Sequence, residues 1–172
     1  MLLKLLFLSA ALMAATKAPL PTVPSVDLPR YLGTWHEIAR YPNVFQRHCA
    51  GDVTADYARN ADGTIRVVNA CSRADGTRIS VEGVARVVGP GRLEVRFAQA
   101  WLAWLPLVWG DYWVIGLAAD YSYAVVGAPS REYLWILARD RQMDEATFTR
   151  IAGGLAALGF DAARLERTAV RP

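Results

Sequence analysis

Residues 53–71 read VTADYARNADGTIRVVNAC, and this stretch indicates the class of fold. Apolar and polar side chains alternate in residues 53–59 and again in residues 64–71, which is the pattern of half-buried β-strands. Between the two runs lies NADG (residues 60–63), in which Asp-Gly favours a tight reversal of the chain. The stretch therefore predicts an antiparallel β-hairpin.

The same pattern extends over most of the chain. Runs rich in Val, Ile, Tyr and Trp are separated by short turns that contain Gly, Asp, Asn or Pro, as in antiparallel sheets. The eight predicted strands are Thr34–Tyr41, Val53–Arg59, Thr64–Cys71, Arg78–Val88, Arg92–Phe97, Tyr112–Leu117, Tyr123–Gly127 and Tyr133–Arg139.

The periodicity changes after Asp144. Apolar residues then recur at helical spacing, acidic residues occupy the first turn, and Gly159 follows the last apolar position. The last three predicted strands are apolar on both faces, so the helix is expected to cover their outer side. The sequence thus predicts an all-β fold, an eight-stranded antiparallel up-and-down β-barrel with one C-terminal α-helix packed outside. The apolar positions of the helix are Phe148, Ile151, Leu155 and Leu158.

Length and composition predict one globular domain. The chain has 172 residues, of which 53% are hydrophobic and 20% charged, so disorder is excluded. Subtracting the charges of Lys4 and Lys17, which lie in a predicted leader, from the formal net charge of +3 leaves +1. This balance provides no basic patch for phosphate groups, so nucleic acid is not an expected partner.

The first residues have the layout of a secretory signal peptide. They read MLLKLLFLSAALMAA, with one early cation, an apolar run and small residues at its end. The run is too short to span a membrane, although an uncleaved anchor or a buried first helix would fit the same pattern. We expect an exported protein. The predicted division is a signal peptide at 1–18, a Pro-rich linker and N-terminal turn at 19–29, and the barrel with its helix at 30–172.

Export makes the two cysteines, Cys49 and Cys71, a candidate disulfide. Positions equidistant from the turn of a hairpin face each other, so the two thiols would meet where its strands open. Two unpaired buried thiols are the alternative.

Several residues predicted to face the barrel interior are too small to fill it. An eight-stranded barrel is either packed by side chains or holds one small ligand, and undersized inward residues favour an apolar cavity suited to an acyl chain. The polar residues among them can contact a ligand by hydrogen bonds or can pack in the core. The predicted ligand-binding residues are Glu37, Ala39, Ala55, Tyr57, Val67, Asn69, Val81, Ala85, Phe97, Tyr112, Val114, Tyr123 and Val125.

Three short motifs lie in order along the predicted strands. They are Gly33-x-Trp35 at the start of the first strand, Asp120-Tyr121 between the sixth and seventh, and Arg139 at the end of the eighth. Together with longer strings such as GTWHEIAR, GDYWVI and YLWIL, they make the chain resemble the lipocalin family over about residues 26–165. Within that family it is similar to the bacterial outer-membrane (Blc-like) branch related to apolipoprotein D.

The resemblance implies structural roles for the motif residues. In lipocalins the motif Trp seals one end of the barrel, or calyx, and the motif Arg lies across it in a cation–π contact. Trp35 and Arg139 are the matching residues, and Gly33, Asp120 and Tyr121 are structural as well. Members of this branch are commonly lipid-anchored, but the predicted leader has no Cys to acylate. We therefore expect a periplasmic protein whose association with the outer membrane, if any, uses no lipid anchor.

Few residues are candidates for catalysis. The chain has two His, and it has no nucleophile elbow, zinc-spaced cluster or phosphate-binding Gly loop. Glu37 shares the strand parity of Trp35, so it is expected to face inward, where it would contact a polar ligand group or pair with an Arg. No catalytic residue, metal or cofactor is expected.

Residues 98–110, AQAWLAWLPLVWG, form an unusually apolar connection between two predicted strands. A soluble connection of this length should be polar. Three interpretations stay open: an interfacial loop that places its aromatic side chains in a lipid surface, a dimer contact, or a lid over the barrel mouth. The protein is accordingly expected to be a monomer or a homodimer. The residues concerned are Trp101, Trp104 and Trp109.

These features predict a non-enzymatic carrier that holds a fatty acid, lysophospholipid or similar amphiphile in its barrel, for storage or transport in the cell envelope. Two other classes of function fit the same fold, since a fold does not fix function. One is an enzyme acting on a small lipid or isoprenoid, with Glu37 and Tyr112 as its acid/base pair. The other is an interaction module that docks a protein through the Trp-rich segment.

Overall fold

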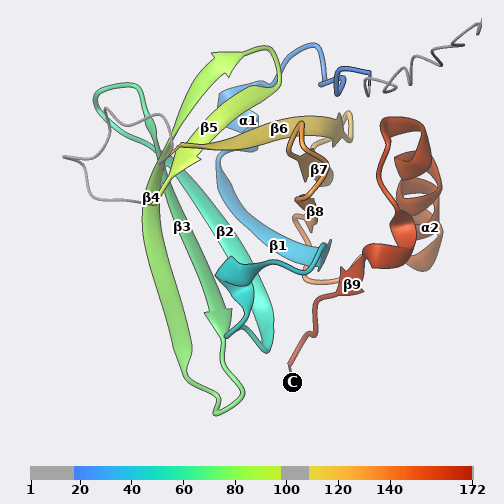
Figure 1. The fold of residues 1–172 in the computed structure, drawn as a ribbon. Coiled ribbons are helices and arrows are strands. Elements are labelled where there is room, and N and C mark those ends of the chain that lie inside the picture. The colour runs from blue at the N-terminus through green and yellow to red at the C-terminus, as the bar shows by residue number, and fades with distance from the viewer. Residues whose placement is uncertain (1–17, 98–108, 172) are drawn as a thin grey trace, which may run out of the picture.

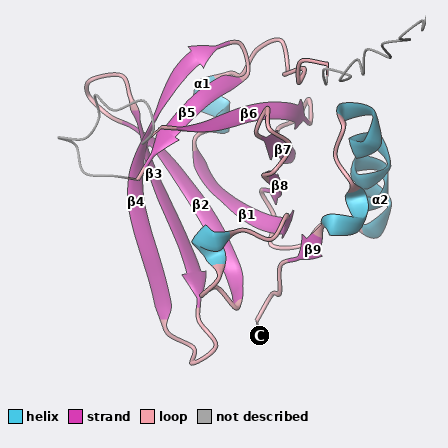
Figure 2. Cartoon of the chain, viewed as in Figure 1, coloured by secondary structure: helices cyan, strands magenta, loops and turns pink. Residues whose placement is uncertain are grey.

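Strand pairing closes the sheet into a barrel in the computed structural model, which describes residues 18–97 and 109–171. Neighbouring strands follow chain order from β2 to β8, the sheet continues through β1 to β9, and β2 also pairs with β1 (Figure 1, Figure 2). The predicted eight-stranded antiparallel up-and-down barrel is confirmed. The strands are β1 Gly33–Arg40, β2 Gly51–Arg59, β3 Ile65–Ser72, β4 Arg78–Gly89, β5 Arg92–Arg96, β6 Gly110–Leu117, β7 Tyr123–Gly127, β8 Leu134–Ala138 and the additional β9 Glu166–Arg167.

β1 is bonded along both edges and so completes the barrel. One edge pairs with β8 through residues 36–40, and the other pairs with β2 through residues 33–36. Beyond that point β9, which the sequence did not predict, takes the place of β2. The chain after β9 continues the seam, because Thr168 N donates to Ile38 O (3.0 Å) and Asp52 N donates to Ala169 O (2.9 Å).

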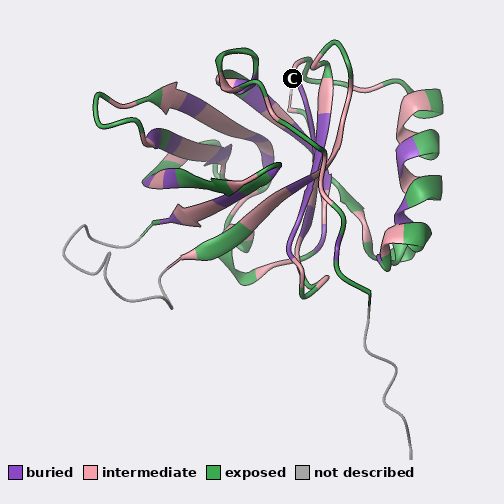
Figure 3. Cartoon of the chain, turned by 90° about the horizontal axis from the view of Figure 1, so that it is seen from above, coloured by how far each residue is buried: buried purple, intermediate pink, exposed green. Residues whose placement is uncertain are grey.

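The C-terminal helix α2 (Glu145–Gly154) lies beside the barrel, on its outside (Figure 3). Asp144 caps the helix by accepting a hydrogen bond from Thr147 N (2.8 Å). A 3₁₀ turn, η4 (Leu155–Leu158), extends it to Gly159, whose φ of +81° belongs to the left-handed region that commonly ends helices.

An outer apolar cluster joins this helix to the sheet. Ile151, Leu155 and Phe160 are buried in it against residues of β1, β7 and β8, including Leu134 and Ile136. The expectation that the helix covers the apolar outer side of the last strands is therefore confirmed. Three shorter elements are α1 Leu28–Tyr31, η1 Val44–Gln46 and η5 Ala162–Arg164.

The Pro-rich segment before α1 is packed onto the barrel rather than free. Leu20 is buried in the outer apolar cluster, and Val23 N donates to Val114 O of β6 (2.9 Å). The segment therefore belongs to the folded domain.

Most of the predicted signal peptide, residues 1–17, lies outside the described residues. Within the described ranges, no helix is long and apolar enough to cross a membrane.

Cys49 and Cys71 form a disulfide, as predicted. The hairpin of β2 and β3 pairs Thr54 with Ala70 and continues outward to the bond, where the two Cα atoms are 5.5 Å apart. The bond ties the connection between β1 and β2 to the end of β3. It thereby fixes one side of the barrel entrance.

Removal of the disulfide should lower stability markedly. The bond links residues separated by 22 positions, and freeing a loop of this length costs about 3 kcal/mol of unfolding free energy in the chain-entropy model. We expect the double variant Cys49→Ala/Cys71→Ala to melt at a lower temperature than the wild type, as measured by circular dichroism. Dithiothreitol should reproduce this decrease in the wild type and have no effect on the variant. Equal melting temperatures for the variant and the oxidised wild type would contradict the role of the bond.

Candidate ligand-binding site

The side chains of one row on the inner face of the barrel become more exposed from β1 to β4. Cross-strand pairing places Trp35, Ala55, Asn69 and Val81 in one row across β1, β2, β3 and β4. Trp35 is fully buried, whereas Val81 at the other end of the row is 48% exposed. Paired residues share a face of a sheet, so solvent reaches the inner wall at Val81. The interior is open toward this side.

A second row leaves space for a bulky neighbour. Tyr57 pairs with Val67, and Val67 pairs with Gly83. The ring of Phe97 lies where a side chain at Gly83 would be, because a Cβ built there would be 2.6 Å from the ring. Phe97 itself is partly exposed. The inner wall at Val67 and Gly83 is therefore apolar, and the Phe97 ring covers it at Gly83.

The closed end is sealed by Trp35 and Arg139. The Arg139 guanidinium lies 3.8 Å from the centre of the Trp35 ring, and its nitrogens donate to the backbone oxygens of Arg30, Leu32 and Thr34 (2.7–2.9 Å). Trp35 Nε1 donates to Tyr31 O (2.8 Å). These contacts hold α1 across the end of the barrel, which we call the floor.

The other motif residues support the same floor. Tyr121, whose φ is +65°, accepts a hydrogen bond from Asp27 N on its hydroxyl group (2.8 Å), and the Arg30 guanidinium lies 4.0 Å from its ring centre. Asp120 accepts two hydrogen bonds from Ser122, which fixes the turn between β6 and β7 and keeps the pKa of the carboxyl low. These residues have the structural role that the sequence predicted.

Three tyrosine hydroxyl groups meet above the floor. The hydroxyl oxygens of Tyr31 and Tyr112 are 2.8 Å apart, and the Tyr57 hydroxyl donates to that of Tyr112 (2.9 Å). Burial raises the pKa of all three phenols, to about 12 for Tyr57. The cluster is therefore uncharged at neutral pH. Tyr31, which the sequence did not predict as a site residue, belongs to it.

A network of protein groups surrounds Glu37 at the opposite end of β1. Its carboxylate is buried and accepts hydrogen bonds from Arg40 Nη1 (3.0 Å), Gln46 Nε2 (2.5 Å) and Thr168 Oγ1 (2.5 Å). Trp135 Nε1 donates to Gln46 Oε1 (3.1 Å) and joins the inner wall to this network. Of the two roles that the sequence left open for Glu37, the structure shows the pairing with an Arg. Its charge is balanced without a ligand.

Comparison with known proteins agrees with these motifs and with the barrel. The profile of the family described as "Lipocalin-like domain" matches residues 26–170. The chain belongs to the lipocalin family.

Two relatives and one solved structure illustrate the similarity. Temperature-induced lipocalin-1 of Arabidopsis thaliana is 38% identical over 157 residues, which cover 88% of this chain and 83% of that protein. Outer membrane lipoprotein Blc of Escherichia coli is 33% identical over 163 residues, covering 91% and 89%. The crystal structure of the cockroach allergen Per a 4 superposes with a TM-score of 0.67 at 19% identity, covering 86% and 90% of the two chains. The last likeness shows the fold alone.

Three residues expected to face the lipocalin calyx lie on the outside instead. Ala39 and Val125 are buried in the outer apolar cluster, and Tyr123 packs against it. The strand register shifts between Glu37 and Ala39, so a β-bulge reverses the alternation at that point of β1. On β7, which has five apolar or aromatic positions, Ala124 and Val126 are the residues that face inward.

The remaining predicted wall residues of the described chain lie on the inner side. Val114 is buried in the inner cluster and continues a row through Val126 to Trp135. Ala85 is buried between Ile65 and the partly buried Val95. No pattern in the sequence indicates the contact between Gln46 and Trp135, because it depends on how the connection between β1 and β2 folds back onto β8.

The Trp-rich connection is described only at its end. Trp101 and Trp104 lie outside the described residues, so the three interpretations of that segment stay predictions. Trp109 is described, and the Arg86 guanidinium lies 4.1 Å from its ring centre. This contact places a cation of β4 against the aromatic ring of the residue just before β6.

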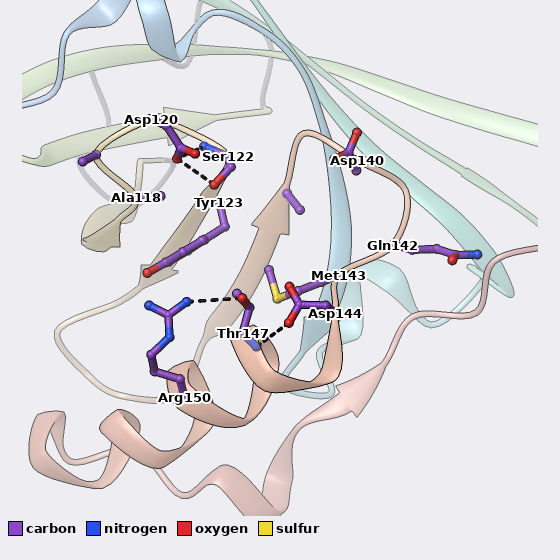
Figure 4. Close-up of a pocket in the computed structure, with 12 residues that line it drawn as sticks. Ala118, Asp120, Ser122, Tyr123, Asp140, Gln142, Met143, Asp144, Thr147 and Arg150 are labelled. Atoms are coloured by element: carbon purple, nitrogen blue, oxygen red, sulfur yellow. Dashed lines mark hydrogen bonds between the residues drawn. The ribbon is translucent and has the colours of Figure 1, made fainter.

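A polar cleft of about 560 Å³ lies outside the calyx, between the turn after β6 and the beginning of α2 (Figure 4). Several of its polar groups bond to one another, as Asp120 accepts from Ser122 and Thr147 accepts from Arg150. Such a surface does not suit an acyl chain. No group of His, Cys, Asp or Glu in the described ranges could hold a metal ion. We therefore assign the candidate site to the barrel interior.

Arg139→Ala should destabilise the protein without weakening ligand binding. The change removes the cation–π contact with Trp35 and three hydrogen bonds to backbone oxygens, at a cost of about 3 kcal/mol of unfolding free energy. The measurements are chemical denaturation for stability and calorimetric titration with hexadecanoic acid for affinity. Arg139→Lys keeps the charge but not the planar donors, so its stability should be intermediate. A loss of affinity with unchanged stability would overturn the structural role.

Proposed function

We propose that this lipocalin is a non-enzymatic carrier of a fatty acid, lysophospholipid or similar amphiphile. The family binds small hydrophobic ligands, and the inner wall of this chain is mostly apolar between the tyrosine cluster and the exposed Val81, with Asn69 as a polar member. That accessible inward valine is the observation that carries the proposal, because an inner wall that solvent reaches is one that a ligand can reach. The acyl chain would enter tail first and leave its polar head at the open side.

The energetics favour such a ligand. Each buried methylene group contributes about 0.8 kcal/mol, so a long acyl chain gains enough to offset the entropy lost on association. Polar contact is available on the wall as well. The Oδ1 atom of Asn69 is buried and has no hydrogen-bond partner in the described part of the chain. A buried acceptor without a partner is costly, and a hydroxyl group of a ligand would satisfy it.

The described site supports a carrier better than an enzyme. Glu37 and Tyr112, the one acid/base pair that the sequence offered, belong to separate hydrogen-bond networks. The carboxylate bonds to Arg40, Gln46 and Thr168, whereas the phenol bonds to two other tyrosines. This separation favours a carrier over an enzyme that would use the two groups together on one substrate.

We further propose that the carrier works in the cell envelope. The relative in Escherichia coli is named an outer membrane lipoprotein, and the leader-like residues 1–18 and the Cys49–Cys71 disulfide are consistent with export. Export would place the carrier in the periplasm, next to membranes that supply acyl-chain ligands. Contact of Trp101 and Trp104 with a lipid surface would then serve transfer of the ligand.

Filling the calyx should weaken ligand binding. Val81→Trp introduces a large ring at the accessible inner wall, and we expect it to weaken the binding of hexadecanoic acid at least tenfold, as measured by calorimetric titration of delipidated protein. Val88→Trp is the matched control, because Val88 lies on the same strand, is 49% exposed and is far from that row. The control should bind like the wild type. Equal weakening by both variants, or by neither, would contradict a ligand site inside the barrel.

A further inference from the structure

The tyrosine cluster above the floor contains more hydrogen-bond donors than its internal bonds use. Tyr31, Tyr57 and Tyr112 each carry one hydroxyl proton, and the cluster has two hydroxyl–hydroxyl contacts. No other hydrogen bond of these hydroxyl groups occurs in the described structure. Two contacts consume two protons, so one phenolic proton of the three is left without an acceptor.

Geometry limits where that proton resides. Tyr57 donates to Tyr112, so its own proton is used. Either Tyr31 or Tyr112 donates in the other contact, and the spare proton belongs to whichever of them accepts there. Tyr31 is 2% exposed and its backbone oxygen accepts from Trp35 Nε1, whereas Tyr112 is only partly buried. Of the two residues that can hold the spare proton, Tyr112 is the more accessible, so we take its hydroxyl group as the one that a ligand in the calyx would approach.

The surroundings of the cluster select an uncharged partner. Burial raises the pKa of the phenols because a negative charge is poorly stabilised there, and the same argument applies to a carboxylate or phosphate of a ligand. A keto, ester or ether oxygen accepts a hydrogen bond without bringing a charge. Such an oxygen pays a smaller desolvation cost than an anion at this depth.

We propose that the Tyr112 hydroxyl donates a hydrogen bond to an uncharged oxygen on the deep, apolar part of the ligand. The preferred cargo is then an amphiphile with an oxygen function near its tail, such as an oxo-fatty acid or an oxidised acyl chain. A plain hydrocarbon tail leaves the spare proton unsatisfied. This inference rests on the proposed function, since it concerns the chemistry of the same calyx.

The test compares two ligands that differ only at the deep end. Hexadecanoic acid and 15-oxohexadecanoic acid share the carboxyl head and the chain length, and the second carries a keto oxygen next to its terminal methyl group. Calorimetric titration of the delipidated full chain should show that the oxo acid binds about fivefold more tightly, the effect of one neutral hydrogen bond. Equal affinities would overturn the inference, and this comparison needs no variant.

Two variants then identify the donor. Tyr112→Phe should bind both acids equally, because its hydroxyl group is gone and the Tyr31 and Tyr57 phenols that lose their partner are buried away from the ligand. Tyr31→Phe should keep the preference or strengthen it, since Tyr112 then has no alternative acceptor for its proton. If the tyrosines only packed against the ligand, each substitution would change the affinities for both acids alike. A preference for the oxo acid that persists in Tyr112→Phe would contradict the assignment of the donor.

Failure of the inference and failure of the proposed function have different signatures. If hexadecanoic acid binds and the oxo acid binds no better, the carrier proposal stands and the role of Tyr112 is wrong. If neither acid binds to the wild type, both proposals are wrong.

Discussion

Closure of the sheet around β1 is the constraint on which the rest of the structure depends. β1 is bonded to β8 along one edge and to β2 and then β9 along the other, so no edge of it stays open. A closed sheet has an inside whose size follows from the number of strands rather than from the side chains that face it. Small residues such as Ala55 and Ala85 line part of this inside, and the proposed ligand site rests on them.

The two ends of this barrel hold their charged side chains in different ways. At the floor, the Arg139 guanidinium has a ring on one face and three backbone oxygens around it, and burial lowers its pKa from the usual value. At the other end, Glu37 is held by side chains from η1, from β1 itself and from the segment after β9. The first arrangement depends only on α1 and the strand ends. The second joins three separate segments, so it couples the entrance of the calyx to the C-terminal seam.

Much of this architecture could be predicted from the sequence, because the features concerned are local. Alternation in residues 53–71 predicts the β2–β3 hairpin, and this hairpin brings the residues just before β2, among them Cys49, close to Cys71 near the end of β3. The capping Asp144 and the final Gly159 bound the helix for the same reason. The floor contact between Trp35 and Arg139 followed from a family resemblance.

The features that the sequence analysis mispredicted or missed are those that no local sequence pattern indicates. A bulge after Glu37 reverses which residues of β1 face inward, so Ala39 lies on the outside. No residue type at that point of the sequence indicates a bulge. β7 is apolar on both faces, so its sequence does not show which residues face inward. The prediction that Val125 faces the calyx is therefore wrong. β9 has two residues and exists through its pairing with β1. The tyrosine cluster depends on the approach of α1 to β2 and β6, which is a property of the closed barrel.

The position of a bound acyl chain tests the central claim most directly. In crystals grown with 16-bromohexadecanoic acid, the anomalous signal of bromine marks the end of the tail. The account predicts one dominant peak inside the barrel, beside Tyr112 and above Trp35. A dominant peak in the cleft next to α2, or elsewhere on the outer surface, would show that the interior is not the ligand site.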